Sequence, residues 1–532
     1  MASNGFAHWL VVLVETLAAL FMLGLALLVV VVLVVWVVDR NQTANSVLRN
    51  FPVVGHFRYG FLRLGEFFRQ YLFASDREEL PFNRAQRVWV YRAAKNVDNT
   101  NAFGSTRDLR AEGVPFFVNA PFPRLDEHHV ESRPVRIGPY AREPYDHAAF
   151  FNISAMSFGA LSAPAVRALS IGAAKAGIWL DTGEGGLAPY HLEGGCDLVF
   201  EIGTAKYGVR TPDGRLDDAK LRAICAHKQV KMISIKLGQG AKPGMGGLLP
   251  AAKVTAEIAA IRGIPIGEDS QSPNRHLDIA NVTQLMDAIG HIRDLTGKPT
   301  GFKAVFGGME WIEELCDEVQ RRGIESAPDF IIVDGSEGGT GAAPQTLMEG
   351  VGLPLHEALP ALVNTLIARG LRERVKVICS GKRITAYDVA WALSMGADFV
   401  NSARGFMLAL GCIQSLQCNR NTCPTGITTH NPRLQRGLVV TDKSEKVYHY
   451  ARNVMMEVGI IAHSCGVDDP RRLDRTHCRV VGDDGLSVPL VKLFPYPPGA
   501  ASTPAAVTAR PSSPSVAHSR DGDDADRIAA SE

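Results

Sequence analysis

The 532-residue sequence has almost no excess of charge of either sign. The 56 Lys and Arg residues are balanced by 55 Asp and Glu residues, which leaves a formal net charge of +1. Proteins that bind nucleic acid carry an excess of basic residues that neutralises phosphates, and this balance shows no such excess. We therefore expect no nucleic acid as a partner.

The sequence also lacks several patterns that mark other classes of protein. Its nine cysteines are an odd number at irregular spacing, unlike the disulfide framework of a small secreted protein, so a reducing compartment fits better. We find no internal repeat that would predict a solenoid. No predicted strand is followed by G-x-G-x-x-G, which excludes a dinucleotide-binding domain of that type. Electrons for a redox reaction would then come from outside the chain.

One long apolar run stands out, from residue 9 to residue 38, and Glu15 is its single charged residue. About 20 apolar residues are enough to cross a bilayer as a helix. The run has neither the basic start nor the small-residue cleavage site of a signal peptide. Arginines follow it at positions 40, 49, 58 and 63, whereas none precedes it. We predict one transmembrane helix in the inner (cytoplasmic) membrane with the rest of the chain in the cytoplasm; the alternative is a buried core helix.

The remaining sequence divides by composition. Residues 39–145 mix polar and aromatic side chains and are predicted to be a connecting subdomain. Residues 441–496 begin with a helical pattern and are expected to pack on the main domain as a cap. Residues 497–532 are rich in Pro, Ala, Ser and charge, so they cannot bury enough apolar surface to fold and are predicted to be disordered.

Between residues 146 and 440, short β-branched runs alternate with amphipathic stretches. In residues 281–295 the apolar positions fall three and four apart, which places them on one face of a helix. Such alternation is typical of a parallel sheet covered by helices, and its length favours a (β/α)8 barrel over a doubly wound sheet. We predict strands within residues 150–157, 177–183, 231–238, 300–307, 329–336, 375–382 and 397–404.

The working face of such a barrel lies at the carboxyl ends of its strands. Three late strands end in small residues: one runs into DGSEGGTGAAP (residues 334–344), the next ends at Ser380 and Gly381, and the last ends at Ser402, Ala403 and Arg404. Backbone amides without a Cβ, together with a cation, can receive a phosphate. The simpler interpretation is a set of tight turns.

Two lysines interrupt apolar strands, Lys236 and Lys303. Each is either paired in the core or points into the barrel mouth, where a cation can stabilise the anionic edge of a reduced flavin; we favour that role for Lys303. Glu184 and His191 are candidates for acid, base or ligand groups, although a single His is as often structural.

Cys412, Cys418 and Cys423 follow a C-x5-C-x4-C-P spacing. Three thiolates from one loop suit an iron-sulfur cluster. A zinc site with His430 as the fourth ligand, and three free thiols, are the alternatives, although the paired spacing of structural zinc sites is absent.

Five motifs appear in a familiar order: AMSFGALS, TGEGGLAPYHLEGG, IKLGQGAKPGMGGLLP, VDGSEGGTGAAP and GCIQSLQCNRNTCPTGITT. Over residues 145 to 440 they resemble the FMN-binding synthase domain of bacterial and plant-type glutamate synthase. With PFNRAQRVWVYRAAK upstream, the whole chain resembles stand-alone FMN-binding glutamate synthase family proteins. The resemblance implies a (β/α)8 barrel with FMN and a 3Fe-4S cluster that converts 2-oxoglutarate and ammonia to glutamate.

The resemblance also implies roles for individual residues. Lys303, Lys242, Gln239 and Glu184 would be catalytic, with Gln239 and Lys242 holding substrate carboxylates. The cluster ligands would be the three cysteines, Cys412, Cys418 and Cys423. FMN would be bound by Ser157, Glu184, Lys236, Lys303, Gly338, Gly339, Thr340, Gly341, Ser380, Gly381, Ala403 and Arg404.

Two departures limit what the resemblance implies. Full-length glutamate synthases begin with a glutamine amidotransferase domain where this chain has its apolar run, so we expect ammonia from a separate protein and electrons from a ferredoxin or reductase subunit. They carry glutamate at the position of Met245, which leaves the identity of the 2-oxo acid open. The alternatives are a membrane-associated flavin and iron-sulfur electron-transfer module without amination activity, and an FMN barrel oxidoreductase acting on a 2-hydroxy acid or a phosphorylated substrate.

Overall fold

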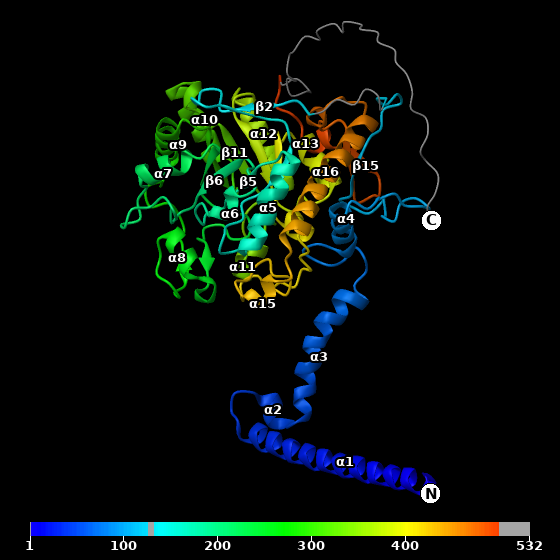
Figure 1. Cartoon of the computed structure of the whole chain (residues 1–532). Helices are drawn as coiled ribbons and strands as arrows, with labels where there is room; N and C mark the ends of the chain where they lie inside the picture. The colour runs from blue at the N-terminus through cyan, green and yellow to red at the C-terminus, as the bar shows by residue number, and fades with distance from the viewer. Residues whose placement is uncertain (1, 126–131, 500–532) are drawn as a thin grey trace, which may run out of the picture. The chain divides into compact units, whose positions relative to one another are not determined.

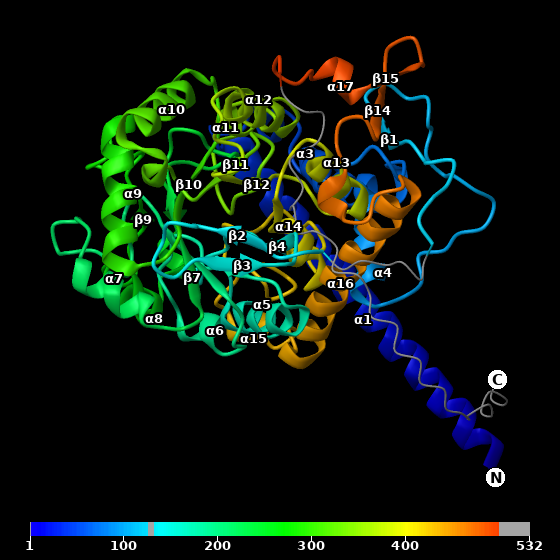
Figure 2. The ribbon, with the colours of Figure 1, turned by 90° about the horizontal axis from the view of Figure 1, so that it is seen from above.

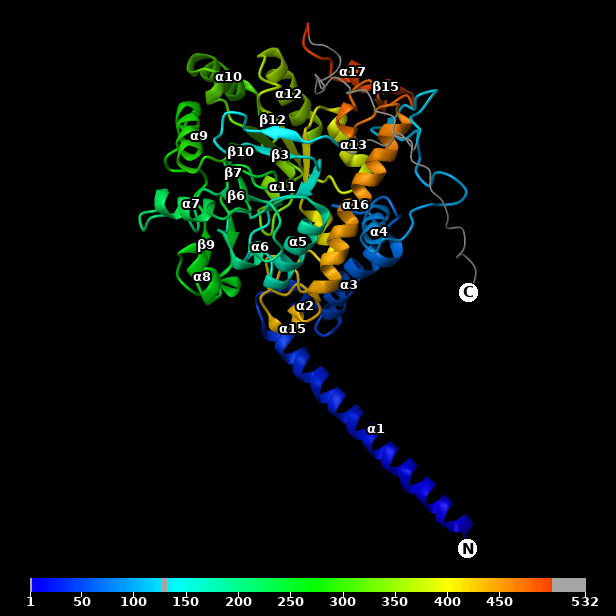
Figure 3. The same ribbon diagram turned by 45° about the horizontal axis from the view of Figure 1, so that its top comes forward.

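The computed structural model describes residues 2–125 and 132–499 and divides into two compact units, Met1–Arg87 and Val88–Glu532. The first unit begins with one uninterrupted helix, α1 (Ala2–Asn41), visible in Figure 3. Its stretch His8–Asn41 is long and apolar enough to cross a membrane. The unit continues through α2 (Ser46–Asn50), α3 (Val54–Phe68) and a π-helical turn, η1 (Arg69–Phe73). Helix α4 (Arg84–Ala94) runs from the first unit into the second.

The second unit is built on a closed barrel of parallel strands, which confirms the predicted (β/α)8 fold. Every predicted run overlaps one of its strands, and only β7 begins outside its run, by one residue. The strand that the sequence analysis missed is β6, whose LVFEI sequence is fully buried but interrupted by Glu201. In chain order the barrel strands are β4 (Phe151–Ile153), β5 (Leu180–Asp181), β6 (Leu198–Ile202), β7 (Val230–Lys236), β10 (Thr300–Ala304), β11 (Phe330–Asp334), β12 (Lys376–Ser380) and β13 (Phe399–Ser402).

Helices surround these strands, as Figure 2 shows from above. Helix α9 illustrates why they form: Asn281 caps its first turn, Gly297 ends it in a left-handed conformation, and its apolar stripe is buried apart from the half-buried Leu295. The helices are α5 (Ala163–Ala176), α6 (Pro189–Leu192), α7 (Asp218–Cys225), α8 (Ala256–Arg262), α9 (Val282–Thr296), α10 (Glu310–Arg322), α11 (Gln345–Gly350), α12 (Leu355–Ala368), α13 (Ala386–Ser394), α14 (Arg404–Ala409) and α15 (Pro432–Gln435).

The amino-terminal end of the barrel is closed by a hairpin of β2 (Val135–Ile137) and β3 (Tyr145–His147). Ile137 and Tyr145 join a buried cluster with Trp179, Phe330 and Phe399 from the strands. Because these side chains fill the interior at this end, we look for a ligand site at the opposite, carboxyl end of the strands.

The segments on either side of the barrel sequence come together. Strand β1 (Pro115–Phe117) pairs with β14 (Cys478–Val481), which pairs with β15 (Ser487–Pro489). The long helix α16 (Val440–Ser464) lies along α5, the two running side by side in Figure 1. The remaining elements are α17 (Leu490–Leu493), the short pair β8 (Leu248–Leu249) and β9 (Ser270–Gln271), and the 3-10 turns Ala251–Lys253, Ile324–Ser326 and Pro470–Arg472. The predicted disordered tail lies outside the described residues from position 500 onwards.

Candidate active site

A pocket opens at the carboxyl ends of β11, β12, β13 and β4, with about 390 Å³ of open space between its lining atoms. Seven of the residues predicted to bind FMN line it: Lys303, Gly338, Gly339, Ser380, Gly381, Ala403 and Arg404. Strand register brings some of them together, because Asp334 of β11 lies beside Ser380 of β12, which lies beside Asn401 of β13. Predictions made from three separate loops therefore meet in one place.

The glycines of this pocket leave no room for side chains. A Cβ on Gly339 would lie 2.8 Å from Nε of Arg404, and one on Gly338 would lie 2.9 Å from Oδ1 of Asp334. Gly381 has φ +129, a conformation that other residues avoid. Backbone amides at these positions can approach a ligand closely, as a phosphate cradle requires.

Cations gather beside the glycines. The Arg404 guanidinium donates to the Glu337 carbonyl at 2.7 Å, and the Arg383 guanidinium lies 3.7 Å from the Glu337 carboxylate. Burial lowers the pKa of Arg404 to about 10 although Asp334 and Glu337 oppose the shift, and burial together with Arg404 lowers the pKa of Lys382. A bound phosphate dianion would relieve this crowding of positive charge, so the cradle fits the phosphate of FMN.

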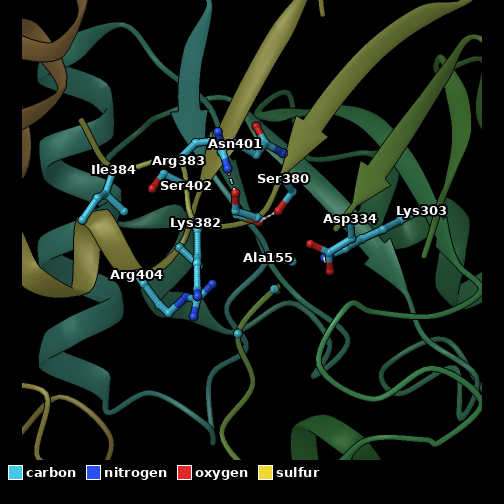
Figure 4. Close-up of a pocket in the computed structure, with 15 residues that line it drawn as sticks. Ala155, Lys303, Asp334, Ser380, Lys382, Arg383, Ile384, Asn401, Ser402 and Arg404 are labelled. Carbon is cyan, nitrogen blue, oxygen red and sulfur yellow. Dashed lines mark hydrogen bonds and ion pairs between the residues drawn. The ribbon is translucent and has the colours of Figure 1, made fainter. Parts of the chain in front are cut away.

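Lys303 marks the other side of the pocket, where Figure 4 shows it next to Asp334 and apart from Lys382 and Arg404. Its Nζ lies 3.7 Å from the Asp334 carboxylate and 3.9 Å from the Glu201 carboxylate. Burial acts to lower the pKa of Lys303, but the neighbouring carboxylates outweigh it and raise the pKa. The side chain therefore keeps its charge inside the barrel and can face the anionic edge of a reduced flavin ring.

Two buried carboxyl groups lie beneath this lysine. Burial, together with the neighbouring Glu201, raises the pKa of Asp181 well above its ordinary value, and burial raises the pKa of Glu201. Within residues 2–125 and 132–499, both side-chain oxygens of Glu201 and Oδ2 of Asp181 have no hydrogen-bond partner. Buried polar atoms normally have partners, so this part of the barrel has polar groups available to water or a ligand.

A row of polar side chains extends from the pocket toward the QGAKPG loop. The Lys236 ammonium lies 3.1 Å from the Glu184 carboxylate and donates to Oε1 of Gln239 at 2.6 Å. Although burial opposes it, Lys236 lowers the pKa of Glu184 and so favours a carboxylate. Lys236 of β7 is also paired in register with Lys303 of β10, so the two lysines lie side by side on adjacent strands.

The loop itself is tied to the glycine-rich cradle. The Gly240 amide donates to Oδ2 of Asp334 at 2.9 Å, and the Lys242 ammonium donates to the Ala342 carbonyl at 3.1 Å. Burial lowers the pKa of Lys242 to about 8. The predicted substrate-binding residues therefore lie next to the predicted cofactor site.

Other predicted residues lie around the pocket. Ser157 receives a hydrogen bond from Arg262 at 3.4 Å, and the Thr340 hydroxyl donates to the Ala342 carbonyl at 3.3 Å. Neither of these, nor Gly341, is among the pocket-lining residues. His191 is fully buried, its Nδ1 accepts from the Ala188 amide at 3.0 Å, and burial lowers its pKa to about 4, while its Nε2 has no hydrogen-bond partner among the described residues.

The cysteine loop is only partly assembled. Thr428 lies beside the thiols of Cys418 and Cys423. Burial raises the pKa of Cys418, whereas hydrogen bonding by Thr425 and Thr428 lowers the pKa of Cys423 against the effect of burial. Among the described residues, no group of three or more His, Cys, Asp or Glu side chains is placed to hold a metal ion. The predicted three-thiolate ligand set is therefore not formed in this structure.

His430 does not complete a zinc site with these thiols. Its Nε2 hydrogen-bonds to the Gly159 carbonyl at 2.8 Å. The nearby Lys253 ammonium donates to the carbonyls of Ala160 at 2.7 Å and Cys418 at 3.2 Å. This buried cation stands next to the two adjacent thiols.

Comparison with known proteins identifies the family. A model described as the conserved region in glutamate synthase matches residues 128–468. The chain belongs to the glutamate synthase family of oxidoreductases. It is 37% identical over 516 residues to the glutamate synthase large subunit-like protein YerD of Bacillus subtilis, covering 89% of this chain and 97% of that protein.

More distant members match over a shorter range. The archaeal-type glutamate synthase [NADPH] of Dehalococcoides mccartyi is 30% identical over 331 residues, which is 62% of this chain and 63% of that protein. Among solved structures, a mandelate oxidase with benzoyl-formic acid is 15% identical with a TM-score of 0.43, covering 74% of this chain and 99% of that one.

Sequence reasoning missed several polar residues of this glutamate synthase-family site. Lys382 and Arg383 directly follow the predicted Ser380 and Gly381, but a sequence does not show which way consecutive loop side chains point. Glu201 was missed together with its strand. The sequence held a signal for Glu201: it is a charged residue in an apolar run, the same pattern that singled out Lys236 and Lys303.

Proposed function

We propose that this protein is an FMN-dependent oxidoreductase that reductively aminates a 2-oxo acid, with 2-oxoglutarate as the first candidate and glutamate as its product. One observation carries the proposal: the Gly240 amide of the QGAKPG loop donates a hydrogen bond to Asp334, which lines the pocket with the glycines and cations. This contact supports a substrate-binding role for the loop, because it ties the loop to the predicted cofactor site. When bound, FMN supplies hydride transfer.

The residues of the chain prepare this chemistry. Lys382, Arg383 and Arg404 would bind the phosphate of FMN. Lys303 keeps its positive charge because Asp334 and Glu201 lie beside it, and it would stabilise a reduced flavin. Lys242 and Gln239 bind and orient the substrate carboxylates, and the contacts of Lys236 with Gln239 and Glu184 hold Gln239 in place.

The decisive experiment uses the purified full-length protein with its flavin reduced by dithionite under anaerobic conditions. Addition of 2-oxoglutarate and ammonium is expected to reoxidise the flavin and to form glutamate in equal amount. A panel of 2-oxo acids and 2-hydroxy acids defines the substrate. If no 2-oxo acid with ammonium reoxidises the flavin, amination is refuted, and an electron-transfer role takes its place.

We also propose that Cys412, Cys418 and Cys423 hold a 3Fe-4S cluster. Soft thiolates suit iron-sulfur clusters, and the thiols of Cys418 and Cys423 are already neighbours beside the cation of Lys253. The test is the iron and acid-labile sulfide content of anaerobically purified protein, with a C412S/C418S/C423S variant. The matched control is a Cys465→Ser variant of the native chain, because Cys465 follows α16 and lies outside the cysteine loop. A protein without iron would refute the cluster.

We further propose that α1 anchors the protein in the inner membrane with its catalytic unit in the cytoplasm. The apolar length of His8–Asn41 and the arginines that follow it support this orientation. Electrons would come from a ferredoxin or reductase subunit and ammonia from a separate protein. Carbonate extraction of membranes tests the anchor: the full-length protein should stay in the membrane fraction, whereas a variant lacking residues 2–38 should be released.

A further inference from the structure

Within the described residues of the first unit, helix α3 carries an apolar face that is largely exposed. Val54, Phe57, Phe61, Leu64 and Phe68 follow one another at spacings of three and four, so they lie along one side of the helix. Phe57 is 64% exposed and Phe61 67% exposed. The following turn, η1, adds three large exposed residues, Tyr71, Leu72 and Phe73. Single exposed apolar residues are ordinary, but a continuous aromatic row indicates a surface that is covered in the working protein.

Basic residues flank this row. Arg58 borders the row beside Val54, Arg63 lies on the opposite side, and Arg69 follows in η1. Arg40 and Arg49 precede the helix, whereas residues 40–73 contain one acidic residue, Glu66. Tyr59, Leu62 and Phe67 also lie outside the row. An apolar row flanked by arginines is the composition of helices that lie flat in the headgroup region of an anionic bilayer.

The start of α3 is fixed to the end of the apolar helix α1. The Asp39 carboxylate, 3% exposed, accepts from the Val53 amide at 2.9 Å and pairs with Nε2 of His56 at 2.9 Å. The Asn45 side chain caps α2 and bonds the Tyr59 hydroxyl at 2.8 Å. We name this set of contacts the elbow: Asp39, Asn45, Val53, His56 and Tyr59. Within the first unit, Figure 1 shows α1 and α3 meeting there through α2.

We infer that α3 and η1 lie in the interface of the bilayer that α1 crosses, with the row from Val54 to Phe68 turned toward the acyl chains and the arginines among the anionic headgroups. The occupant of the apolar face is lipid because the face begins within about 20 residues of a bilayer-spanning run and carries basic flanks. The elbow sets the direction in which α3 leaves α1. The inference rests on the proposed membrane anchor.

The experiment places the photocrosslinking residue p-benzoylphenylalanine at single positions of the full-length protein in vesicles of phosphatidylethanolamine and phosphatidylglycerol. Phe61 is the test position, Arg63 on the opposite face is its matched control, and Leu25 in α1 reports on the anchor. We expect phospholipid adducts from positions 25 and 61, and at least tenfold fewer from position 63, with adducts read by mass spectrometry.

Each result decides a different statement. Adducts at position 25 with none at position 61 would overturn the interfacial helix and leave the anchor in place. Protein adducts from position 61 would also overturn it, since they would show that protein covers this face. Absence of lipid adducts at position 25 would refute the anchor and the inference together.

The elbow supplies a second test in the same vesicles. Asp39→Ala removes the acceptor shared by the Val53 amide and His56, so adducts at position 61 should fall severalfold while those at position 25 persist. Equal adducts at position 61 in both proteins would contradict the role of the elbow.

Discussion

Arg404→Ala should weaken FMN binding through loss of the phosphate contact. The guanidinium is half-buried in a cradle of glycine backbone and lies near Lys382 and Arg383, so solvent screens its interaction with a phosphate only weakly. A hydrogen bond to a charged group contributes about 1.5 to 3 kcal/mol. At 1.4 kcal/mol per factor of ten, the Kd for FMN should rise about 10-fold to 150-fold.

Riboflavin provides the matched ligand, because it has the same ring and lacks the phosphate. Flavin fluorescence is titrated with apoprotein for both ligands and for three proteins: the native chain, Arg404→Ala and Arg404→Lys. Arg404→Ala should raise the Kd for FMN and change the Kd for riboflavin by less than about twofold. Arg404→Lys should recover part of the FMN affinity, because lysine keeps the positive charge but lacks the two-pronged geometry of the guanidinium. Arg369→Ala, which breaks an exposed pair with Asp317, is the control variant.

Equal losses for FMN and riboflavin would refute the reasoning, since the arginine would then support the shape of the pocket and not the phosphate. Thermal unfolding separates this outcome from misfolding. The Arg404 hydrogen bond to the Glu337 carbonyl contributes to that shape, so a small drop in stability is expected and a large one is not.

Three further predictions concern buried charges. Because burial lowers the pKa of Lys242 to about 8, it loses its proton as pH rises through 8, so the KM for the 2-oxo acid should increase above pH 8 and Lys242→Met should flatten that profile. Asp329→Ala leaves Arg293 and Arg374 without their shared carboxylate at the closed end of the barrel, and should lower the free energy of unfolding by about 3 to 5 kcal/mol in urea titrations, against under about 1 kcal/mol for an exposed pair. Burial raises the pKa of Glu201, so the unfolded chain ionises at lower pH than the folded one, and stability should fall as pH rises above the ordinary pKa of a carboxyl group. Glu201→Gln should reduce this fall, and an unchanged slope would contradict the shift.

The sequence predicted the barrel because its physical basis is local. Apolar runs bounded by glycine, and stripes such as that of α9, reflect burial on one or both faces of each element. Strand β6 was not predicted because Glu201 interrupts its apolar pattern, and only the barrel structure shows that this carboxyl group is buried. The strand-end residues Ser380 and Arg404 could be predicted because parallel strands place their carboxyl ends on one face.

The spacing of Cys412, Cys418 and Cys423 predicted a shared ligand set, and here sequence was insufficient. A spacing fixes how far apart residues lie along a loop, but the loop conformation decides where the sulfurs point, and the described structure brings the thiols of Cys418 and Cys423 near each other without forming a three-ligand group.

The sequence by itself determined the alternation of strands and helices, the apolar first helix and the kinds of side chain available at the strand ends, because these depend on periodicity and composition. Only the tertiary structure decided that Asp334 joins the cradle to the QGAKPG loop, that Glu201 and Lys303 share the interior, and that Lys382 and Arg383 line the pocket beside Arg404. The reason is physical: the directions of side chains and the pairing of charges from distant strands are set when the barrel closes, and the separation of residues along the sequence does not determine them.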